Sequence, residues 1–576
     1  MIERYWKPFV VLFLSAFLFL SLTSMSQKSP IVDEPVHLAA GYSYLVTRDF
    51  RLNPEHPPLI KMIAAAPLLL LGLDFRTDEL TSWDGVIGFP TRFVFRNSLP
   101  ADVIVFWGRL PIVLISAALG WFTFWWARQL AGILAGMLAL ALYVLDPNIM
   151  AHSQLVTTDV GLAALFALAV YVLVRYLGRP TRLNLWLVGG AFALALLAKF
   201  SAVFIIPTYA LITLVHLARR GWSALWSSWW RLSAVMVAAT IVLTFVAYGF
   251  EMRTIGRAPA SAVAFLERHT SPSSAVRGVI LAVGSNIPVP APSFWKGMLE
   301  SAGRQERASY LRGQSYAGSR PDYFPVAFAV KTPVGTLALL FIASLVLAYR
   351  VFFAPERVPV SLDEWAVLLS AAVFFGLTIL NGHNIGVRYL LPILPLIFIF
   401  IASQLNWLYE RRGRWKLIVP SAVVALVTFV LVSSLRTYPH YLAYFNEFVG
   451  GPRNGWRYLV DSNLDWGQDL PGLKTYLKLH NIDDVYLNYF GPTRCGPRVC
   501  SEVLDYYGIR WKPVPSTEEV ARTGAPRGVV AVSISWLTLY DPKGDSWLWA
   551  YRPTATIGHS IWVFDLRDHR PERVRS

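Results

Sequence analysis

The chain has 576 residues, of which 55% are apolar, 14% aromatic and 15% charged, whereas about 25% of the residues in an ordinary soluble domain are charged. This composition excludes a soluble enzyme of the average kind. The formal charge of +16 does not indicate nucleic acid, because Lys and Arg fall mostly between long apolar runs and act first as topology signals. Two cysteines, without C-x-x-C or zinc-ligand spacing, exclude a disulfide scaffold, a redox motif and a zinc finger.

Eleven apolar segments are long enough to cross a bilayer, because about 20 residues rising 1.5 Å each span a hydrocarbon layer of about 30 Å. They lie at about 9–25, 104–126, 132–150, 160–177, 184–198, 202–218, 232–250, 332–353, 365–381, 388–406 and 416–435. The first resembles a signal peptide, but it lacks a small-residue cleavage pattern and many spans follow, so we expect a retained anchor. The stretch 184–218 is too long for one span and has Lys199 at its middle, so we divide it in two.

Positive residues predict the sidedness of the chain, because Lys and Arg collect in short cytoplasmic loops. With the N-terminus inside, these loops hold fifteen Lys and Arg residues, from Arg4 near the start to Lys416 before the last span. The short outer loops hold only Lys199 and Arg388. We therefore expect a multi-pass protein of the cytoplasmic (inner) membrane whose C-terminus lies outside.

Two long outer loops follow from this topology, at about 26–103 and 251–331. Within the first loop, the apolar stretch 59–73 is too short to span, so we expect it to lie in the interface or to re-enter the membrane. Spans and loops together form a predicted membrane domain of residues 1–435.

The tail, residues 436–576, is predicted to form a small α/β domain outside the membrane. Strands are expected at 485–490, 529–537 and 561–566, and short helices at 468–480 and 499–507. Asp465 and Gln468 have the spacing of a capping box for the first of these helices. Cys495 and Cys500 both fall in this outer domain, where a disulfide can persist; two free thiols are the alternative.

Two acids, Asp33 and Glu34, directly follow the first span in the sequence IVDEPVH (31–37). A carboxylate at the outer edge of the membrane can act as a general base toward an acceptor hydroxyl. The local alternative is capping, because an acid before Pro in the first turn begins many helices. In the same loop, Glu55 and His56 precede two prolines that fix the backbone, which suits either a rigid site or an ordinary loop entering the interfacial segment.

These two clusters together resemble the membrane glycosyltransferases of family 39, polytopic α-helical enzymes of the GT-C type. The family includes protein O-mannosyltransferases and the aminoarabinose transferase that modifies lipid A. Further segments similar to bacterial members are Arg109-Leu110-Pro111, Thr157-Thr158-Asp159, Ala198-Lys199-Phe200, Lys331-Thr332-Pro333 and Gly386-Val387-Arg388-Tyr389-Leu390-Leu391-Pro392. The resemblance covers residues 1–435, whereas the tail, with Asp465-Trp466-Gly467-Gln468-Asp469, resembles a bacterial subset only.

The resemblance implies transfer of a sugar, with inversion, from a polyprenyl-phosphate-linked donor to a protein, lipid or glycan on the outer face. Carried over by position, Asp33 would be the catalytic base and Glu34 would orient the acceptor. Glu55 matches a glutamate that helps ligate zinc in the aminoarabinose transferase, whereas His56 stands where that enzyme has Lys. Glu55 is therefore the only candidate ligand for a divalent metal, and no other cofactor is implied.

Four cations, Arg109, Lys199, Lys331 and Arg388, are predicted at the outer ends of spans. Cations fixed there would stabilise the negative charge that develops on a departing lipid phosphate. Ionisable groups at membrane depth are costly and favour a functional interpretation, although Lys and Arg at helix ends also reach to the interface without any role in chemistry. Asp159 opens the fourth span, where it either contacts the acceptor or caps the helix.

Two other functions remain as alternatives. A transporter would also use many spans with buried charges, but transporters place these charges near the midplane and contain internal repeats. A ligase that moves a whole lipid-linked glycan would share the membrane site and differ only in the size of its donor.

Overall fold

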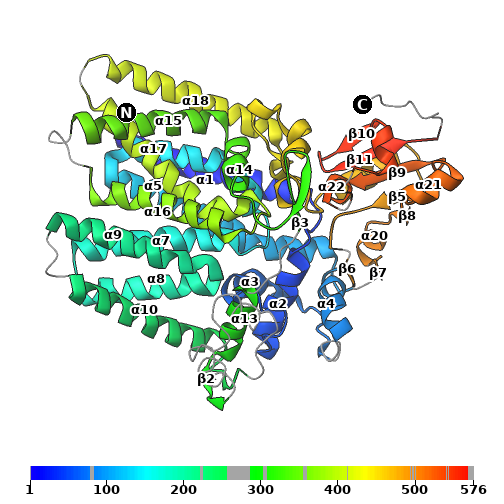
Figure 1. The fold of residues 1–576 in the computed structure, drawn as a ribbon, viewed down its shortest axis with the longest axis horizontal. Coiled ribbons are helices and arrows are strands. Elements are labelled where there is room, and N and C mark those ends of the chain that lie inside the picture. The colour runs from blue at the N-terminus through cyan, green and yellow to red at the C-terminus, as the bar shows by residue number, and fades with distance from the viewer. Residues whose placement is uncertain are drawn as a thin grey trace.

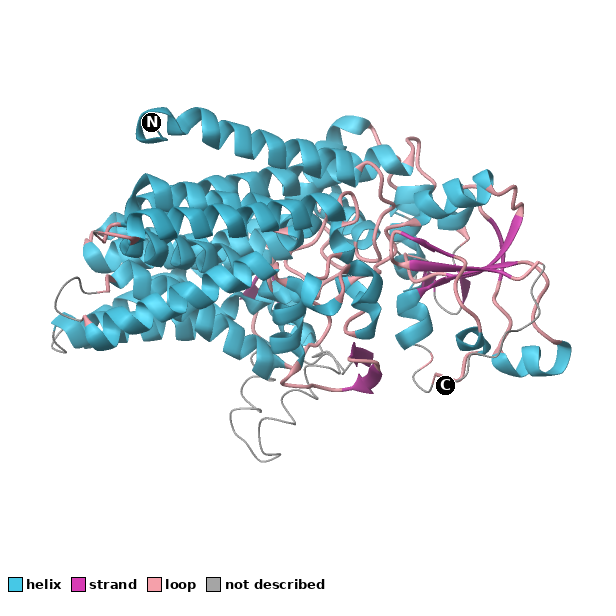
Figure 2. Ribbon diagram, turned by 90° about the horizontal axis from the view of Figure 1, so that it is seen from above, coloured by secondary structure: helices cyan, strands magenta, loops and turns pink. Residues whose placement is uncertain are grey.

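The computed structural model describes residues 2–77, 83–220, 225–255, 286–302, 308–354, 360–411, 413–492, 494–495, 498–499, 501–539, 541 and 544–567. Within these residues, nine helices are long and apolar enough to cross a membrane by length and composition. The bundle contains α1 (Ile2–Met25), α5 (Ala101–Leu145), α7 (Asp159–Gly178), α8 (Arg182–Ala198), η3 (Phe200–Phe204) with α9 (Ile205–Arg220), α10 (Leu225–Ala247), α15 (Val334–Phe353), α16 (Leu362–Asn381), η5 (Val387–Ile393) with α17 (Leu394–Tyr409), and α18 (Trp415–Thr437). These helices lie side by side, and the C-terminal sheet lies at one end of the bundle (Figures 1 and 2).

Helix α5 is a hairpin of two spans. Its 45 residues are interrupted at Ala131 and Gly132, where Gly132 has φ 83° and ψ −178°. The Oγ of Ser116 lies 2.8 Å from the hydroxyl oxygen of Tyr143, whereas residues 27 positions apart in a straight helix are separated by about 40 Å. The chain therefore folds back at Gly132, as the separate spans at 104–126 and 132–150 predicted.

Helix α8 is shorter than the other spans, with 17 residues, and ends at Ala198. Lys199 then has extended backbone angles before η3 begins, so the predicted division of 184–218 into two segments is confirmed. Counting the halves of α5 separately and adding α8 gives eleven apolar segments in the described part of the chain. The prediction of a polytopic helical membrane protein with about eleven spans is thereby confirmed.

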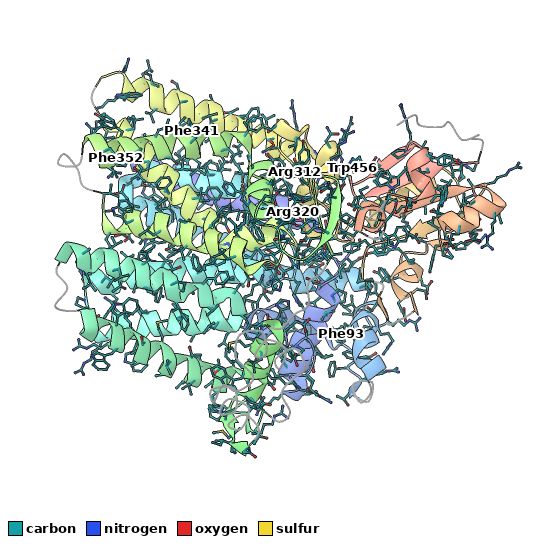
Figure 3. All side chains as sticks on the ribbon, viewed as in Figure 1. Phe93, Arg312, Arg320, Phe341, Phe352 and Trp456 are labelled. Carbon is teal, nitrogen blue, oxygen red and sulfur yellow. The ribbon has the colours of Figure 1, made fainter. Side chains whose placement is uncertain are left out.

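The surface of the bundle is apolar, as contact with lipid requires. Phe341 and Phe352 on α15 have 66% and 75% of their side-chain surface exposed, and both lie along the outside of the bundle (Figure 3). Inside the bundle, 83% of the most apolar stretch of the η5–α17 span is buried. Leu345, Tyr349 and Phe353 on the same helix are exposed as well, and a contiguous apolar surface of this kind is typical of contact with hydrocarbon rather than with water.

Shorter elements cover the end of the bundle nearest the tail (Figure 1). They are α2 (Glu34–Thr47), α3 (Pro58–Ala65), η1 (Ala66–Leu71), α4 (Trp83–Phe95), α6 (Pro147–Ser153), α13 (Pro292–Ala302), α14 (Tyr323–Lys331), the pair β1 (Met252–Arg253) and β2 (Val289–Pro290), and the hairpin β3 (Ala308–Leu311) and β4 (Gln314–Ala317). The predicted interfacial segment 59–73 corresponds to α3 and η1, in which Leu70 has 88% of its surface exposed.

The tail begins with short turns on the end of the bundle and continues into a five-stranded sheet of order β10-β11-β9-β5-β8. Its elements are η6 (Tyr441–Ala443), η7 (Glu447–Val449), η8 (Pro452–Arg457), η9 (Asp461–Asn463), α19 (Leu470–Leu479), β5 (Asp484–Asn488), β6 (Arg494–Cys495), β7 (Arg498–Val499), α20 (Glu502–Tyr506), β8 (Arg510–Lys512), α21 (Thr517–Thr523), β9 (Val529–Ser533), α22 (Ile534–Leu539), η10 (Trp547–Ala550), β10 (Ala555–Ile557) and β11 (Ile561–Asp565). Strand β5 pairs in parallel with β8 and β9, and β11 pairs antiparallel with β9.

The structure corrects two expectations for the tail. The predicted strand 529–537 ends at Ser533, and its second half forms helix α22. Asp465 does not cap the helix that follows it, because α19 begins only at Leu470 and the Asp465 carboxylate instead accepts a hydrogen bond from the backbone N–H of Ser535, in the first turn of α22. The predicted disulfide between Cys495 and Cys500 lies outside the residues whose side chains the structure describes.

Candidate active site

Asp33 lies between α1 and α2, at the end of the bundle that carries the tail. It occupies the position before the first residue of α2, but its side chain makes no capping hydrogen bond. Its Oδ2 instead accepts a hydrogen bond of 3.2 Å from Nη1 of Arg388. The capping alternative for Asp33 is therefore wrong, and its carboxylate, with 29% of its surface exposed, remains open to a second partner.

Arg388 lies in η5, where the chain enters the span that continues as α17. Its Nη1 also lies 3.7 Å from Oδ2 of Asp159, so one guanidinium nitrogen faces two carboxylates. The guanidinium carbon lies 4.3 Å from the ring centre of Trp466. Its Nε is buried and has no hydrogen-bond acceptor in the described structure, which leaves a directed donor for a ligand oxygen.

Lys199 and Asp159 complete this cluster. Asp159 is the first residue of α7, and its Oδ1 accepts a hydrogen bond of 2.5 Å from the Lys199 ammonium. Lys199 also lies over the ring of Tyr389, 4.3 Å from its centre. The prediction that Asp159 only caps its helix is not supported, because its side chain faces two cations from other helices. Asp33, Asp159, Lys199 and Arg388 thus form one group with two acids and two cations.

Glu34 and Arg109 form a separate, buried ion pair. The two carboxylate oxygens of Glu34 accept hydrogen bonds from Nε and Nη2 of Arg109, at 2.8 and 2.6 Å, and from the backbone N–H groups of Ile31 and Val156. The remaining guanidinium N–H groups donate to the carbonyl oxygens of residues 25, 28 and 29. All five guanidinium N–H groups are therefore used within the protein, and this pair fixes the segment that carries Asp33.

Lys331 is also held by the protein. Its ammonium donates hydrogen bonds of 2.9 and 2.6 Å to the carbonyl oxygens of Leu442 and Asn463, and it lies 4.6 Å from the ring centre of Phe445. Only 1% of its surface is exposed. Of the four predicted cations, the structure brings Lys199 and Arg388 together with Asp33, whereas Arg109 and Lys331 each hold neighbouring chain segments.

Glu55 and His56 lie in the loop between α2 and α3, next to the acid-bearing segment. The Lys61 ammonium fixes this loop by donating to the carbonyl oxygens of Asn53 and His56, at 2.8 and 2.6 Å. The ring of His56 meets the ring of His37 edge-on at 5.3 Å. Burial lowers the pKa of His37, opposed by nearby Asp33, so we expect this imidazole to be neutral at pH 7.

No group of three or more His, Cys, Asp and Glu side chains is arranged to hold a metal ion among the described residues. Glu55 is therefore not part of a group of three or more such side chains among the described residues, and these residues do not fit a metal centre.

Two apolar grooves open between the spans. One, of about 530 Å³, lies between α1, α5, α17 and α18 and is lined by residues such as Tyr409 and Val419, at the end of the bundle away from Arg388. The other, of about 380 Å³, lies between α8, α9, α10 and α13. Phe294 lines this second groove and lies 5.5 Å from the ring centre of Phe200, the residue after Lys199. The second groove therefore lies next to the segment that carries Lys199.

Trp466 is the site residue that the sequence did not single out. It was part of the motif 465–469, but its contact with Arg388 joins residues 78 positions apart and depends on how the tail docks.

A family model described as dolichyl-phosphate-mannose-protein mannosyltransferase matches residues 10–257. The resemblance to glycosyltransferase family 39 is thereby confirmed for this part of the chain. Among curated protein sequences, none matches this chain.

Several solved structures are similar at low sequence identity. The apo structure of ArnT from Cupriavidus metallidurans is 15% identical, with 97% of both chains covered and a TM-score of 0.47. The S. cerevisiae protein O-mannosyltransferase Pmt1-Pmt2 complex bound to the sugar donor is 10% identical, covers 74% of this chain and 89% of that chain, and has a TM-score of 0.47. The oligosaccharyltransferase AglB from Archaeoglobus fulgidus is 12% identical, with coverage of 93% and 70% and a TM-score of 0.42.

Proposed function

We propose, from the match of residues 10–257 to protein O-mannosyltransferases and from the geometry of the charged cluster, that this protein is a membrane glycosyltransferase. Its donor is a sugar linked to a polyprenyl phosphate. Its acceptor is a hydroxyl group of a protein, lipid or glycan on the outer face of the cytoplasmic membrane. Asp33 is the general base, and Arg388 with Lys199 binds the phosphate.

The proposed reaction is a single displacement with inversion at the anomeric carbon. The acceptor oxygen attacks that carbon while Asp33 takes the hydroxyl proton, and the bond between the anomeric carbon and the phosphate oxygen breaks. The polyprenyl phosphate leaves with the bonding electrons. Arg388 stabilises the charge that develops on it, because a preorganised cation in a partly buried site acts more strongly than one in water.

The observation that carries this proposal is the contrast between the two arginines. Arg109 uses every N–H within the protein, whereas Arg388 keeps a buried Nε without an acceptor in the described structure while its Nη1 contacts Asp33. An unsatisfied buried donor is costly, so this Nε is available to a ligand atom. A phosphate oxygen supplies that acceptor directly beside the proposed base.

The remaining predicted residues support this pair. Glu34 and Arg109 fix the segment before Asp33, and Lys331 ties α14 to the tail. We assign these residues to positioning rather than to contact with the donor. His56 lies beside His37, one helical turn from Asp33, and Glu55 precedes it in the same loop. We assign Glu55 and His56 to the acceptor side.

The groove between α8, α9, α10 and α13 supports an isoprenoid donor. Its lining is almost entirely apolar, from Leu196 and Ile206 to Met236 and Met298. A polyprenyl chain in this groove would pack its CH₂ and CH₃ groups against these apolar side chains. The hydrophobic stabilisation of about 25 cal/mol per Å² applies only to surface that leaves water. Within the membrane, packing alone therefore favours binding of the chain. Its phosphate would then reach Lys199 and Arg388.

The positions of the charges argue against a transporter. Within the described spans, the buried charged side chains Arg109, Asp159, Arg350 and Glu364 lie near helix ends rather than at the midplane, where transporters bind their ions. A ligase for a whole glycan remains distinguishable by the mass of the transferred group.

We expect Asp33→Asn to reduce glycosyl transfer by about 10²–10⁴-fold, the usual contribution of a general base. Binding of the lipid should persist, because Arg388 and Lys199 remain. Turnover is measured with polyprenyl-phosphate mannose and polyprenyl-phosphate aminoarabinose as donors and membranes as acceptors, and binding with a polyprenyl monophosphate.

A matched control is Asp483→Asn, since that carboxylate is 87% exposed in the tail and should leave both measurements unchanged. Normal turnover in Asp33→Asn would remove Asp33 as the base. Solute uptake by proteoliposomes without any glycosyl transfer would instead favour a transporter.

A further inference from the structure

The segment from Asn463 to Gln468 lies between the bundle and the tail sheet and contacts the chain just before Asp33. The backbone N–H of Val32 donates a hydrogen bond of 3.1 Å to the carbonyl oxygen of Trp466. Ser29 donates through its N–H to the carbonyl oxygen of Gln468, at 3.1 Å, and through its Oγ to that of Gly467, at 2.9 Å. The tail thus forms a short backbone pairing with the segment that carries the proposed base.

The same segment also holds the chain just before Arg388. The Oδ1 of Asn463 accepts a hydrogen bond of 2.8 Å from the backbone N–H of Val387. Its Nδ2 donates to the hydroxyl group of Tyr323, at 3.1 Å. Residues 463–468 of the tail therefore connect Val32 to Val387, whose neighbours Asp33 and Arg388 form the charged pair.

Trp466 covers one face of Arg388. Its ring centre lies 4.3 Å from the guanidinium carbon, and only 2% of the Trp466 side chain is exposed. A cation over an indole ring is attracted by the ring's quadrupole, and more strongly where both are shielded from water. The indole limits the positions that the guanidinium can adopt while leaving its edge, with Nε, free to meet a ligand.

The tail sheet fixes this segment in turn. The Asp465 carboxylate accepts a hydrogen bond of 2.9 Å from the N–H of Ser535, and the Ser535 hydroxyl donates to the carbonyl oxygen of Asp465 at 2.9 Å. The Tyr489 hydroxyl donates to the carbonyl oxygen of Gly467. Tyr489 directly follows β5, and Ser535 lies in the first turn of α22, two residues after β9. Both are at the carboxyl ends of these strands, the edge at which open parallel sheets usually bind ligands. Here residues 465–467 occupy that edge.

We propose that Trp466 is a positioning residue that orients Arg388 toward the lipid phosphate, and that residues 463–468 make the tail a component of the transferase site. This inference rests on the proposed function, since it assigns phosphate binding to Arg388. The tail sheet then holds Asp33 and Arg388 in position relative to each other, in addition to any contact with the acceptor.

The test measures the dissociation constant of a polyprenyl monophosphate for the full-length protein in detergent. We expect Trp466→Leu to raise this constant by about 2–30-fold, the equivalent of about 0.5–2 kcal/mol. Trp466→Phe, which keeps an aromatic face, should restore most of the affinity. Trp511→Leu is the control, because Trp511 is a half-buried tryptophan of β8, on the far edge of the same sheet, and it should bind like the wild type.

A double-mutant cycle separates positioning from a general structural effect. We expect Arg388→Gln to weaken binding and the double variant Arg388→Gln/Trp466→Leu to bind no more weakly than Arg388→Gln alone. Wild-type binding in Trp466→Leu, or fully additive losses in the double variant, would overturn the role of Trp466 while the proposed function stands. Unchanged binding in Arg388→Gln would overturn both.

Thermal unfolding of each variant shows whether it is folded. If Trp466→Leu does not fold, the cycle is measured with Trp466→Phe. We then expect a loss of about twofold to threefold that disappears in the Arg388→Gln background, because Phe retains a weaker cation–π interaction than Trp. A loss of the same size in both backgrounds would contradict the proposal.

Discussion

Arg109 and Arg388 show how residues with similar sequence surroundings differ in role. Both lie near the tail-side end of a span, and both contact an acid from the segment after α1. They differ in the number of N–H groups that the protein satisfies. Arg109 is fully enclosed by Glu34 and three carbonyl oxygens, so it stabilises the chain, whereas Arg388 retains a donor for a ligand.

A second residue-scale prediction concerns Asp465, where burial raises the pKa to about 8, opposed by the Ser535 hydrogen bonds. The Asp465 carboxyl therefore holds its proton more tightly in the folded protein than in the unfolded chain, where the pKa of Asp is about 4. Stability from this group falls as the pH rises from about 4 to about 8 and changes little above that. We expect Asp465→Asn to lose less thermal stability than the wild type between about pH 5 and pH 8, measured by unfolding in detergent.

Asp469 does not obscure this comparison. Burial opposes ionisation of Asp469, but Lys28 and His440 hold its pKa below the ordinary value. Its contribution to stability is therefore present above about pH 4 and is lost only as the pH falls further. Asp483→Asn, at an exposed position, should keep the wild-type pH dependence. Identical slopes for Asp465→Asn and the wild type would contradict the prediction.

At the scale of elements, the turn in α5 depends on one glycine. The backbone angles of Gly132, φ 83° and ψ −178°, fall in a region that is essentially restricted to Gly and costs other residues about 1–3 kcal/mol. No atom lies within 4 Å of a Cβ added there, so the cost is conformational rather than steric. We expect Gly132→Ala to lower the unfolding temperature of the protein in detergent.

Gly190 supplies the matched control for this element. It lies within α8, and a Cβ added there also meets no atom within 4 Å. Because its backbone is helical, Gly190→Ala should be neutral or slightly stabilising, in line with the better helix propensity of Ala. Equal effects of the two substitutions would show that the hairpin geometry at Gly132 is not required.

Other elements show where local patterns were insufficient. The β-branched run at 529–537 predicted one strand, but the chain turns into α22 at Ile534, whose N–H donates to the carbonyl oxygen of Ser560. Ser535 then faces Asp465. This change of direction is set by partners that are 26 and 70 residues away, so the strand-like composition could not reveal it.

At the scale of the whole molecule, one continuous hydrophobic core runs from the bundle into the tail sheet, including Ala402 of α17, Trp466 and Val530 of β9. The charged cluster lies at this junction. In contrast, the cations Lys7 and Lys416 lie near the starts of α1 and α18, at the opposite end of the bundle (Figure 1). This separation supports the proposed orientation, with the site and the tail outside the cell membrane.

The orientation can be tested without mutations. A membrane-impermeant amine reagent applied to intact cells should modify Lys474 and Lys478 of α19, which are exposed, as mass spectrometry of the recovered protein would show. Lys7 and Lys416, also exposed, should react only after the cells are opened. Modification of Lys7 and Lys416 in intact cells, with the α19 lysines protected, would reverse the proposed sidedness.

The sequence by itself determined the membrane class, the division into spans and the acids and cations near their ends. These features follow from apolar length, charge placement and short motifs, all of which are local along the chain. Which cation meets which acid was decided only by the tertiary structure, because the contacts join residues 40 to 355 positions apart. The tail's part in the site was decided in the same way, since the ring of Trp466 reaches Arg388 only once the sheet has docked on the bundle.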